Sequence, residues 1–69
     1  ETGRYQEAKG MYLQLVEHYP EFWPARKNFG VLCELYLNDK ACAIDQYGVY
    51  LDAKPQDKDV KLWLTALQR

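Results

Sequence analysis

The sequence predicts an all-α fold of about four helices that pack as antiparallel helical hairpins in a single domain. Apolar residues recur at spacings of three and four, which is the period of one face of a helix. No segment shows the sustained alternation of a half-buried β-strand. Prolines and turn-forming residues separate the periodic segments by short intervals, so consecutive helices become antiparallel neighbours. The chain has 69 residues, which suffice for one domain over 1–69.

The first two helices are expected over 4–19 and 22–37. Thr2 is the candidate N-cap of the first helix. Pro20 ends that helix because proline lacks an N–H and restricts the residue before it. Pro24 suits the first turn of the second helix, where its missing N–H is not needed. The two apolar faces consist of Tyr5, Ala8, Tyr12, Leu15, Val16 and Tyr19, and of Ala25, Phe29, Leu32, Cys33 and Tyr36.

The last two helices are expected over 39–53 and 57–68. Asn38 and Asp39 are both N-cap candidates for the third helix, and Asp57 is the candidate for the fourth, because a short polar side chain can accept a free N–H of the first turn. Pro55 ends the third helix. Charged residues are expected on the outer faces of all four helices. The apolar faces consist of Ala43, Ile44, Tyr47, Tyr50 and Leu51, and of Val60, Leu64 and Leu67, with Trp63 beside the last stripe.

The chain also contains an internal repeat, which appears when the sequence is shifted by 35 positions. A small residue lets two helix backbones approach closely, an aromatic residue four positions later fills the wider gap, and a proline ends the unit. One hairpin cannot bury its apolar stripe alone, so such units stack. The shift places Ala8 on Ala43, Tyr12 on Tyr47, Pro20 on Pro55, Phe29 on Leu64 and Leu32 on Leu67.

A larger set of residues carries a resemblance to a known family. The set comprises Gly3, Tyr5, Glu7, Ala8, Tyr12 and Pro20, then Phe29 and Gly30, then Asn38, Ala43, Tyr47 and Pro55. In type and order these residues resemble the tetratricopeptide repeat, and the resemblance covers nearly the whole chain. Arg26 stands where the family often has tryptophan, and Cys33 stands where an aromatic residue is usual. The resemblance implies a right-handed α-solenoid, of which 57–68 is the last or capping helix.

The resemblance also implies a binding site, because the family lines its concave groove with the first helix of each hairpin. The corresponding residues here are Lys27, Asn28, Val31 and Glu34, beside Pro24. Lys27 and Asn28 resemble part of a clamp for the terminal carboxylate of a peptide, since both groups donate hydrogen bonds to carboxylates. Val31 occupies a position where such a clamp would need a polar group. A generic peptide groove is therefore preferred over the clamp, with a plain solvated face as the alternative.

Two cysteines flank the turn between the second and third helices. Cys33 and Cys42 lie at similar heights in an antiparallel hairpin, so a disulfide is feasible if both side chains face inward. The preferred interpretation is a pair of buried free thiols that act as small apolar groups. Their spacing is not that of a CxxC motif, so a zinc or redox site is not expected.

No motif of a catalytic or cofactor site is present. The chain lacks a Gly-rich phosphate loop, a GxSxG elbow, an HExxH motif and a pair of catalytic carboxylates. His18 is the sole histidine and has no partner at ligand spacing, so no metal is expected. The sequence therefore favours a non-catalytic protein–protein interaction module that binds a peptide or partner protein in its groove, without a cofactor.

Composition and charge exclude several other classes. With 48% apolar and 14% aromatic residues the chain can form a core, which argues against disorder. The net charge of −1 provides no basic surface for nucleic acid. No apolar run approaches the roughly 20 residues that span a bilayer, so membrane insertion is not expected. The chain begins without Met, and we expect a piece of a longer protein whose compartment the sequence leaves open.

Two alternative functions stay open. The first is an RNA-binding helical repeat of pentatricopeptide type, a family of helix pairs with a period of 35. Such proteins read bases with side chains of successive repeats, but the acidic balance of this chain argues against it. The second is an architectural segment that associates weakly with itself through the exposed end of the stack.

Overall fold

The computed structural model describes the backbone of residues 2–69 and the side chains of residues 3–69. The fold is all-helical, with no strand in this range, and the prediction of an all-α fold with about four helices is confirmed. The Cα radius of gyration is 11.5 Å, close to the ~11 Å of a compact domain of this length. The helices are α1 (Thr2–His18), α2 (Trp23–Leu35), α3 (Lys40–Ala53) and α4 (Lys58–Leu67).

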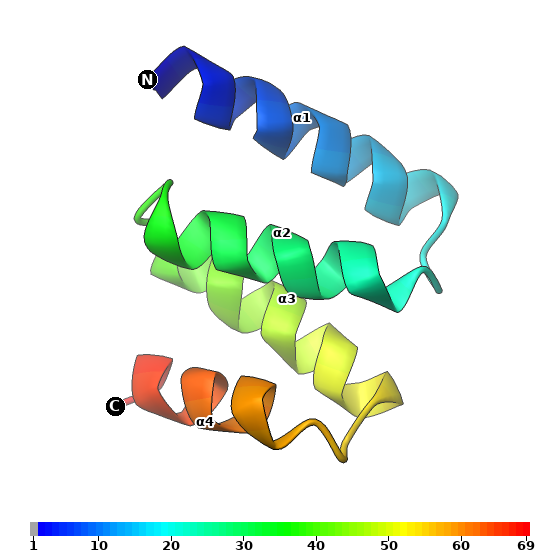
Figure 1. Cartoon of the computed structure of the whole chain (residues 1–69), viewed down its shortest axis with the longest axis vertical. Helices are drawn as coiled ribbons and strands as arrows, with labels where there is room; N and C mark the ends of the chain where they lie inside the picture. Colours follow the sequence, from blue (N-terminus) through cyan, green and yellow to red (C-terminus); the bar gives the residue numbers. More distant parts are fainter. Residues whose placement is uncertain (1) are drawn as a thin grey trace.

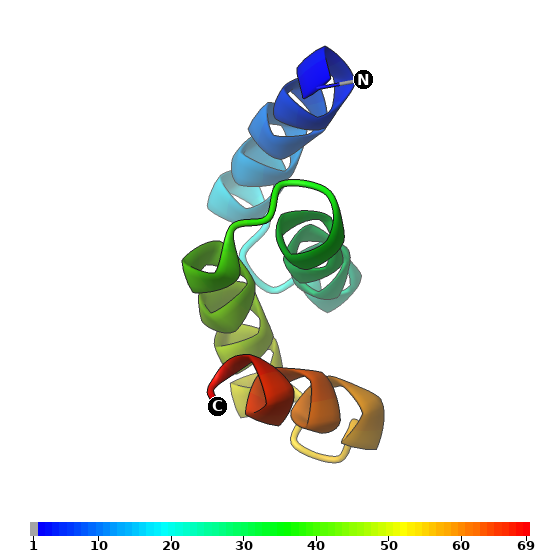
Figure 2. The same ribbon diagram turned by 90° about the vertical axis from the view of Figure 1, so that its left-hand side faces the viewer.

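Each helix packs against the next one in the chain, and the interface between α2 and α3 is the most extensive. The helices lie one below the other, and each runs in the opposite direction to the one before it (Figure 1). In the view turned by 90°, α2 and α4 lie on one side of the stack and α3 lies on the other (Figure 2). Val31 and Glu34, two of the predicted groove residues on α2, line a hollow together with Trp63 of α4.

Local signals in the sequence account for the starts of the helices. The Asp39 carboxylate accepts the Cys42 N–H at 3.1 Å, and the Asp57 carboxylate accepts the Val60 N–H at 3.2 Å. Asp39 is thus the N-cap of α3 in preference to Asn38, and the prediction for Asp57 is confirmed, because each bond satisfies a donor that the first turn of a helix leaves free. Pro24 lies in the first turn of α2 as expected. Thr2 is the first residue of α1, and its proposed capping side chain lies outside the described residues.

The second helix ends earlier than the predicted range of 22–37. It stops at Leu35, after which the N–H of Leu37 bonds to the carbonyl of Leu32 at 3.0 Å. Asn38 then adopts a φ of 54°, a left-handed conformation that asparagine tolerates better than most residues. The chain therefore reverses direction at Asn38, although the apolar residues Tyr36 and Leu37 continue the stripe of α2 in the sequence.

The core lies mainly between α2 and α3, where the predicted stripes meet. Phe29 and Tyr47 are its largest fully buried side chains. Tyr12 of α1 stacks on Phe29 with ring centroids 5.6 Å apart. Tyr19 was predicted on the inner stripe of α1 but is 63% exposed, and it lies just beyond His18, the last residue of α1. The buried apolar residues are Ala25, Phe29, Leu32, Cys33, Ala43, Tyr47, Tyr50 and Val60.

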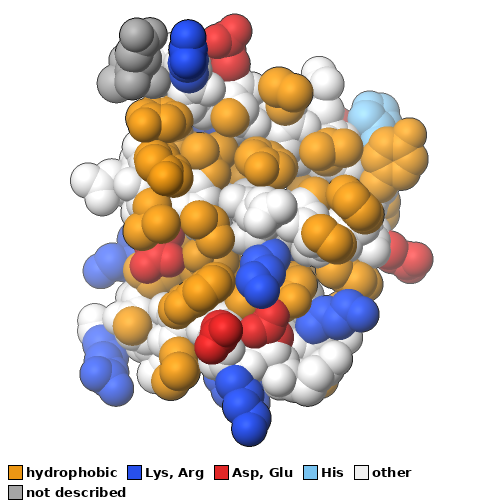
Figure 3. Space-filling model, viewed as in Figure 1, with side chains coloured by type: hydrophobic (Ala, Val, Ile, Leu, Met, Phe, Trp, Pro, Cys, Tyr) orange, Lys and Arg blue, Asp and Glu red, His pale blue; other side chains and the backbone are white. Residues whose placement is uncertain are grey.

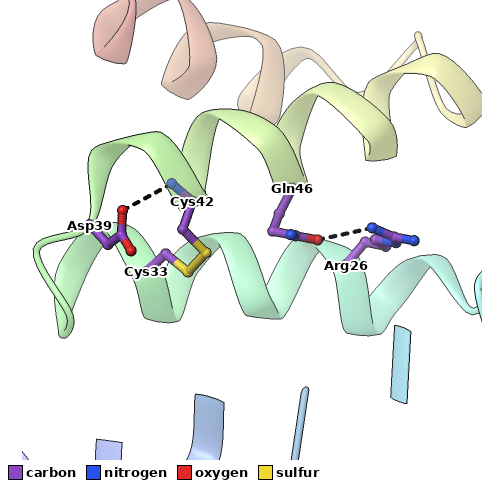
Figure 4. Close-up of a disulfide and its surroundings, with 5 residues drawn as sticks. All are labelled: Arg26, Cys33, Asp39, Cys42 and Gln46. Atoms are coloured by element: carbon purple, nitrogen blue, oxygen red, sulfur yellow. Dashed lines mark hydrogen bonds between the residues drawn. A yellow bond between two sulfur atoms is a disulfide. The ribbon is translucent and has the colours of Figure 1, made fainter. Parts of the chain in front are cut away.

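A polar pair also lies inside the interface between α2 and α3. The guanidinium of Arg26 donates to the Gln46 side-chain oxygen at 3.2 Å, and Gln46 is buried (Figure 4). The Arg26 Nε is buried without a hydrogen-bond partner among the described residues. Arg26 thus departs from the expectation that charged residues lie on outer faces, because it is half-buried and bonded to a residue of α3.

Candidate functional site

The predicted groove residues lie along one side of α2, and Val31 is their centre. Val31 borders two hollows, one shared with α4 and one shared with α1. Glu34 lines the first hollow and Asn28 lines the second. Three of the four predicted residues thus line adjacent hollows, and Lys27 lines neither of them. We refer to the surface around both hollows as the α2 face.

The hollow between α2 and α4 measures about 240 Å³ and combines aromatic, aliphatic and acidic groups. The Tyr47 hydroxyl donates to the Glu34 carboxylate at 2.9 Å. Burial, and then the hydrogen bond to Glu34, raises the pKa of Tyr47 well above its usual 10.0, so the phenol stays protonated and acts as the donor. Tyr47 and Trp63 place their ring centroids 5.8 Å apart. The lining residues are Val31, Glu34, Leu35, Tyr47 and Trp63.

The hollow between α1 and α2 is larger, about 360 Å³, and its walls combine aromatic and aliphatic side chains. Tyr5 of α1 and Tyr36 at the end of α2 pack with ring centroids 5.0 Å apart. Asn28 is the exposed amide on this side of Val31. The lining residues include Tyr5, Ala8, Tyr12, Asn28, Val31 and Tyr36.

Lys27 is engaged in contacts within the chain. Its ammonium lies 3.1 Å from a carboxylate oxygen of Asp57, and that oxygen also accepts the Tyr50 hydroxyl at 2.7 Å. The ammonium stands 5.8 Å from the ring centroid of Tyr50 and 5.7 Å from that of Trp63. The hydrogen bond to Asp57 raises the pKa of Lys27. The Lys27 ammonium is already bonded to the carboxylate of Asp57. This arrangement disfavours a clamp in which Lys27 binds the terminal carboxylate of a peptide.

Apolar side chains are exposed across the α2 face. Leu35 is 65% exposed and Trp63 is 37% exposed. Hydrophobic side chains continue over this side of the molecule from α1 to α4 (Figure 3). Exposed apolar side chains that gather around hollows are typical of surfaces that contact other proteins.

The two cysteines form a disulfide in the structure. Cys33 is fully buried on α2 and Cys42 is half-buried on α3, and their Cα atoms are 5.8 Å apart. The bond joins the two helices close to the turn at Asp39 (Figure 4). The preferred interpretation of two free thiols is therefore not the state that the structure holds.

The structure describes neither a metal centre nor a membrane span. His18 is the exposed last residue of α1. In residues 2–69, no group of three or more His, Cys, Asp or Glu side chains is arranged to hold a metal ion. None of the described helices has the length and apolar character needed to cross a bilayer.

Sequence reasoning missed part of the site. Leu35 was not singled out, and Tyr47 was assigned to the core alone. Trp63 was placed beside the apolar stripe of the last helix. This flanking position was the available signal that Trp63 belongs to the site, since such a residue of α4 reaches the neighbouring helix. Comparison of the chain with protein-family models, with curated proteins and with solved structures finds no match.

Proposed function

We propose that this chain is a tetratricopeptide-type interaction module that binds an apolar segment of a partner protein on the α2 face. The observation that carries this proposal is the pair of adjacent hollows on either side of Val31. Their aromatic and aliphatic walls are partly exposed, so binding would remove this apolar surface from water. Burial of apolar surface stabilises most protein complexes.

The packing of the helices supports the assignment to this repeat type. Gly30 lets the ring of Tyr47 approach the backbone of α2, which is a role for the glycine of the Phe29-Gly30 pair. Ala43 of α3 is fully buried in the same core. We propose that the two hairpins belong to a right-handed solenoid, in which such small residues let successive helices stack.

The polar groups of the α2 face support binding rather than catalysis. The Glu34 carboxylate accepts a hydrogen bond from a phenol, and the Lys27 ammonium is bonded to a carboxylate. Neither donor has the lowered pKa of an activated nucleophile, since the pKa values of Tyr47 and Lys27 are both raised. The groups therefore suit recognition of a partner side chain.

A peptide selection tests the proposal. A random peptide library displayed on phage would be selected against the immobilised chain, with a Val31→Asp variant as the counter-target. We expect enriched peptides with two or more apolar residues that bind the original chain and lose binding to Val31→Asp. An Asp45→Lys variant on the exposed surface of α3 is the matched control and should retain binding. Equal binding to all three proteins, or no enrichment, would contradict the proposal.

A second function, weak self-association through α1, is favoured by one observation. Met11 and Tyr19 are both exposed and line a hollow of about 320 Å³ on α1. Light scattering over a concentration series tests it, with Met11→Lys as the variant. A mass that rises with concentration, and that Met11→Lys returns to that of a monomer, is expected if α1 associates. A strict monomer at high concentration would rule the association out.

A further inference from the structure

We propose that the hollow between α2 and α4 binds a cationic side chain of the partner, with arginine preferred over lysine. The inference rests on the proposed function, because it names the chemistry that the same face would recognise. Three features carry it: the carboxylate of Glu34, the partly exposed aromatic ring of Trp63, and the aliphatic walls beside them.

The charge of the hollow is the first argument. In residues 2–69 the ion pair that the structure describes joins Lys27 and Asp57, so these two charges largely cancel and Glu34 stays without a basic partner. The Tyr47 hydroxyl uses one oxygen of the Glu34 carboxylate. An ionised carboxylate offers about four acceptor positions. Glu34 can therefore accept further hydrogen bonds, and a cation is the complementary donor.

The aromatic rings are the second argument. A cation within about 6 Å of the centroid of a Trp, Tyr or Phe ring is attracted by the electrons of the ring face. Trp63 already shows this behaviour, since the Lys27 ammonium lies 5.7 Å from its ring centroid. Tyr47 lies beside Trp63, with ring centroids 5.8 Å apart, and is fully buried, so the ring that a cation can reach is that of Trp63. A guanidinium has a planar shape that stacks on such rings and bonds a carboxylate in a fork, which is the reason for preferring arginine.

The aliphatic wall is the third argument. Val31 and Leu35 line the same hollow as Glu34, and Leu35 is largely exposed. The methylene groups of an arginine or lysine stem pack well on apolar surface while the charged head reaches a polar group. An anionic side chain would meet the Glu34 carboxylate here and is disfavoured by repulsion. The hollow of about 240 Å³ is large enough for one such side chain.

An NMR titration tests this inference without a known partner. The isotope-labelled chain would be titrated with Nα-acetyl-arginine amide, and with Nα-acetyl-norleucine amide as the uncharged probe of similar stem. We expect the arginine probe to shift the signals of Val31, Leu35 and the Trp63 indole, and to bind about tenfold more tightly than the norleucine probe. Equal binding of both probes, or shifts that map to other residues, would overturn the proposal.

Variants separate the charge from the shape of the hollow. Glu34→Gln keeps an acceptor for the Tyr47 hydroxyl and removes the charge, so we expect about tenfold weaker binding of the arginine probe. Trp63→Leu keeps an apolar side chain and removes the ring, and should also weaken this probe. Asp45→Asn, a carboxylate on the exposed surface of α3, is the matched control and should have no effect. Unchanged binding in Glu34→Gln or in Trp63→Leu contradicts the cation site.

The outcome is distinguishable from failure of the proposed function. If selected peptides bind the α2 face and Glu34→Gln leaves both peptide and arginine binding unchanged, the cation site is wrong and the interaction module stands. If the arginine probe binds as expected and no peptide is ever enriched, the cation site stands and the proposed function is wrong.

Discussion

The ring of Tyr47 lies directly over the Cα of Gly30, so close that a β-carbon at this position would overlap the ring. Tyr47 is fully buried and is held in place through its hydroxyl by Glu34. Gly30 lies inside α2 with an ordinary helical φ. The glycine is thus required by the close approach of α3 and not by backbone conformation.

Gly30→Ala should therefore destabilise the fold. A methyl group gains about 1 kcal/mol in helix propensity, but overpacking a well-packed core costs typically about 1–3 kcal/mol. We expect a net loss of up to about 2 kcal/mol, because the ring of Tyr47 is fully buried and its hydroxyl is bonded to Glu34. Urea unfolding followed by circular dichroism measures the change.

Gly48→Ala is the matched control for this substitution. Gly48 also lies inside a helix, and a β-carbon there meets no atom within 4 Å. It should stabilise the chain by up to about 1 kcal/mol. If Gly30→Ala stabilises the chain as much as Gly48→Ala, the close packing of α2 on α3 is contradicted.

The hydrogen bonds of Asp57 should make stability depend on pH. The Tyr50 hydroxyl, the Val60 N–H and the Lys27 ammonium lower the pKa of Asp57 below its usual 3.8. A folded-state pKa below the unfolded value means that the stabilisation is present above about pH 4 and is lost as the pH falls further. We expect the free energy of unfolding to decrease below pH 4 in the original chain.

Asp57→Asn isolates this charge, since asparagine is also a good N-cap. The variant should be less stable at neutral pH and should lose less stability between pH 4 and pH 2. Asp52→Asn, at an exposed position of α3, is the control and should keep the acid-induced loss. If Asp57→Asn loses as much stability between pH 4 and pH 2 as the original chain does, the role of Asp57 is contradicted.

The backbone at Asn38 gives an independent test of the turn between α2 and α3. With a φ of 54°, glycine fits without steric cost, and a β-branched residue is strained by about 1–2 kcal/mol. Asn38→Gly should therefore leave stability nearly unchanged, and Asn38→Val should lower it by that amount. Thermal unfolding of both variants checks the expectation. Equal melting temperatures would mean that the turn has a different conformation.

The disulfide should contribute measurably to stability. Cys33 and Cys42 are separated by 9 positions, and closing a loop of this size stabilises a fold by about 2–3 kcal/mol on the chain-entropy model. Urea unfolding with and without a reductant measures the difference. The Cys33→Ala, Cys42→Ala double variant should have the stability of the reduced protein, and the reductant should not change that stability. Two titratable thiols in the natively purified, non-reduced chain would contradict the bond.

Local signals explain how much of the fold was predictable from the sequence. Asp39 and Asp57 follow turns and precede apolar stripes, so their capping roles were readable within three residues. Phe29 and Tyr47 follow the helical period and were assigned to the core correctly. The end of α2 was not predicted, because Tyr36 and Leu37 continue the apolar character after the backbone has turned at Asn38.

Contacts between distant residues could not be predicted in this way. The bond from Lys27 to Asp57 joins residues 30 positions apart, and the bond from Arg26 to Gln46 joins residues 20 positions apart. Periodicity assigns a residue to a face and does not identify its partner on another helix. Lys27 was therefore included among the groove residues by its position on the helix, while its engagement with Asp57 became visible only in the structure.

The most direct test of the account is to locate the bound partner segment on the α2 face. A peptide enriched by the selection would be titrated into the isotope-labelled chain and followed by NMR. We expect the largest shifts at Asn28, Val31, Leu35 and the Trp63 indole, and little change at Asp45 on α3. Largest shifts around Asp45, or an even spread over the molecule, would contradict the central claim that the α2 face is the interaction surface.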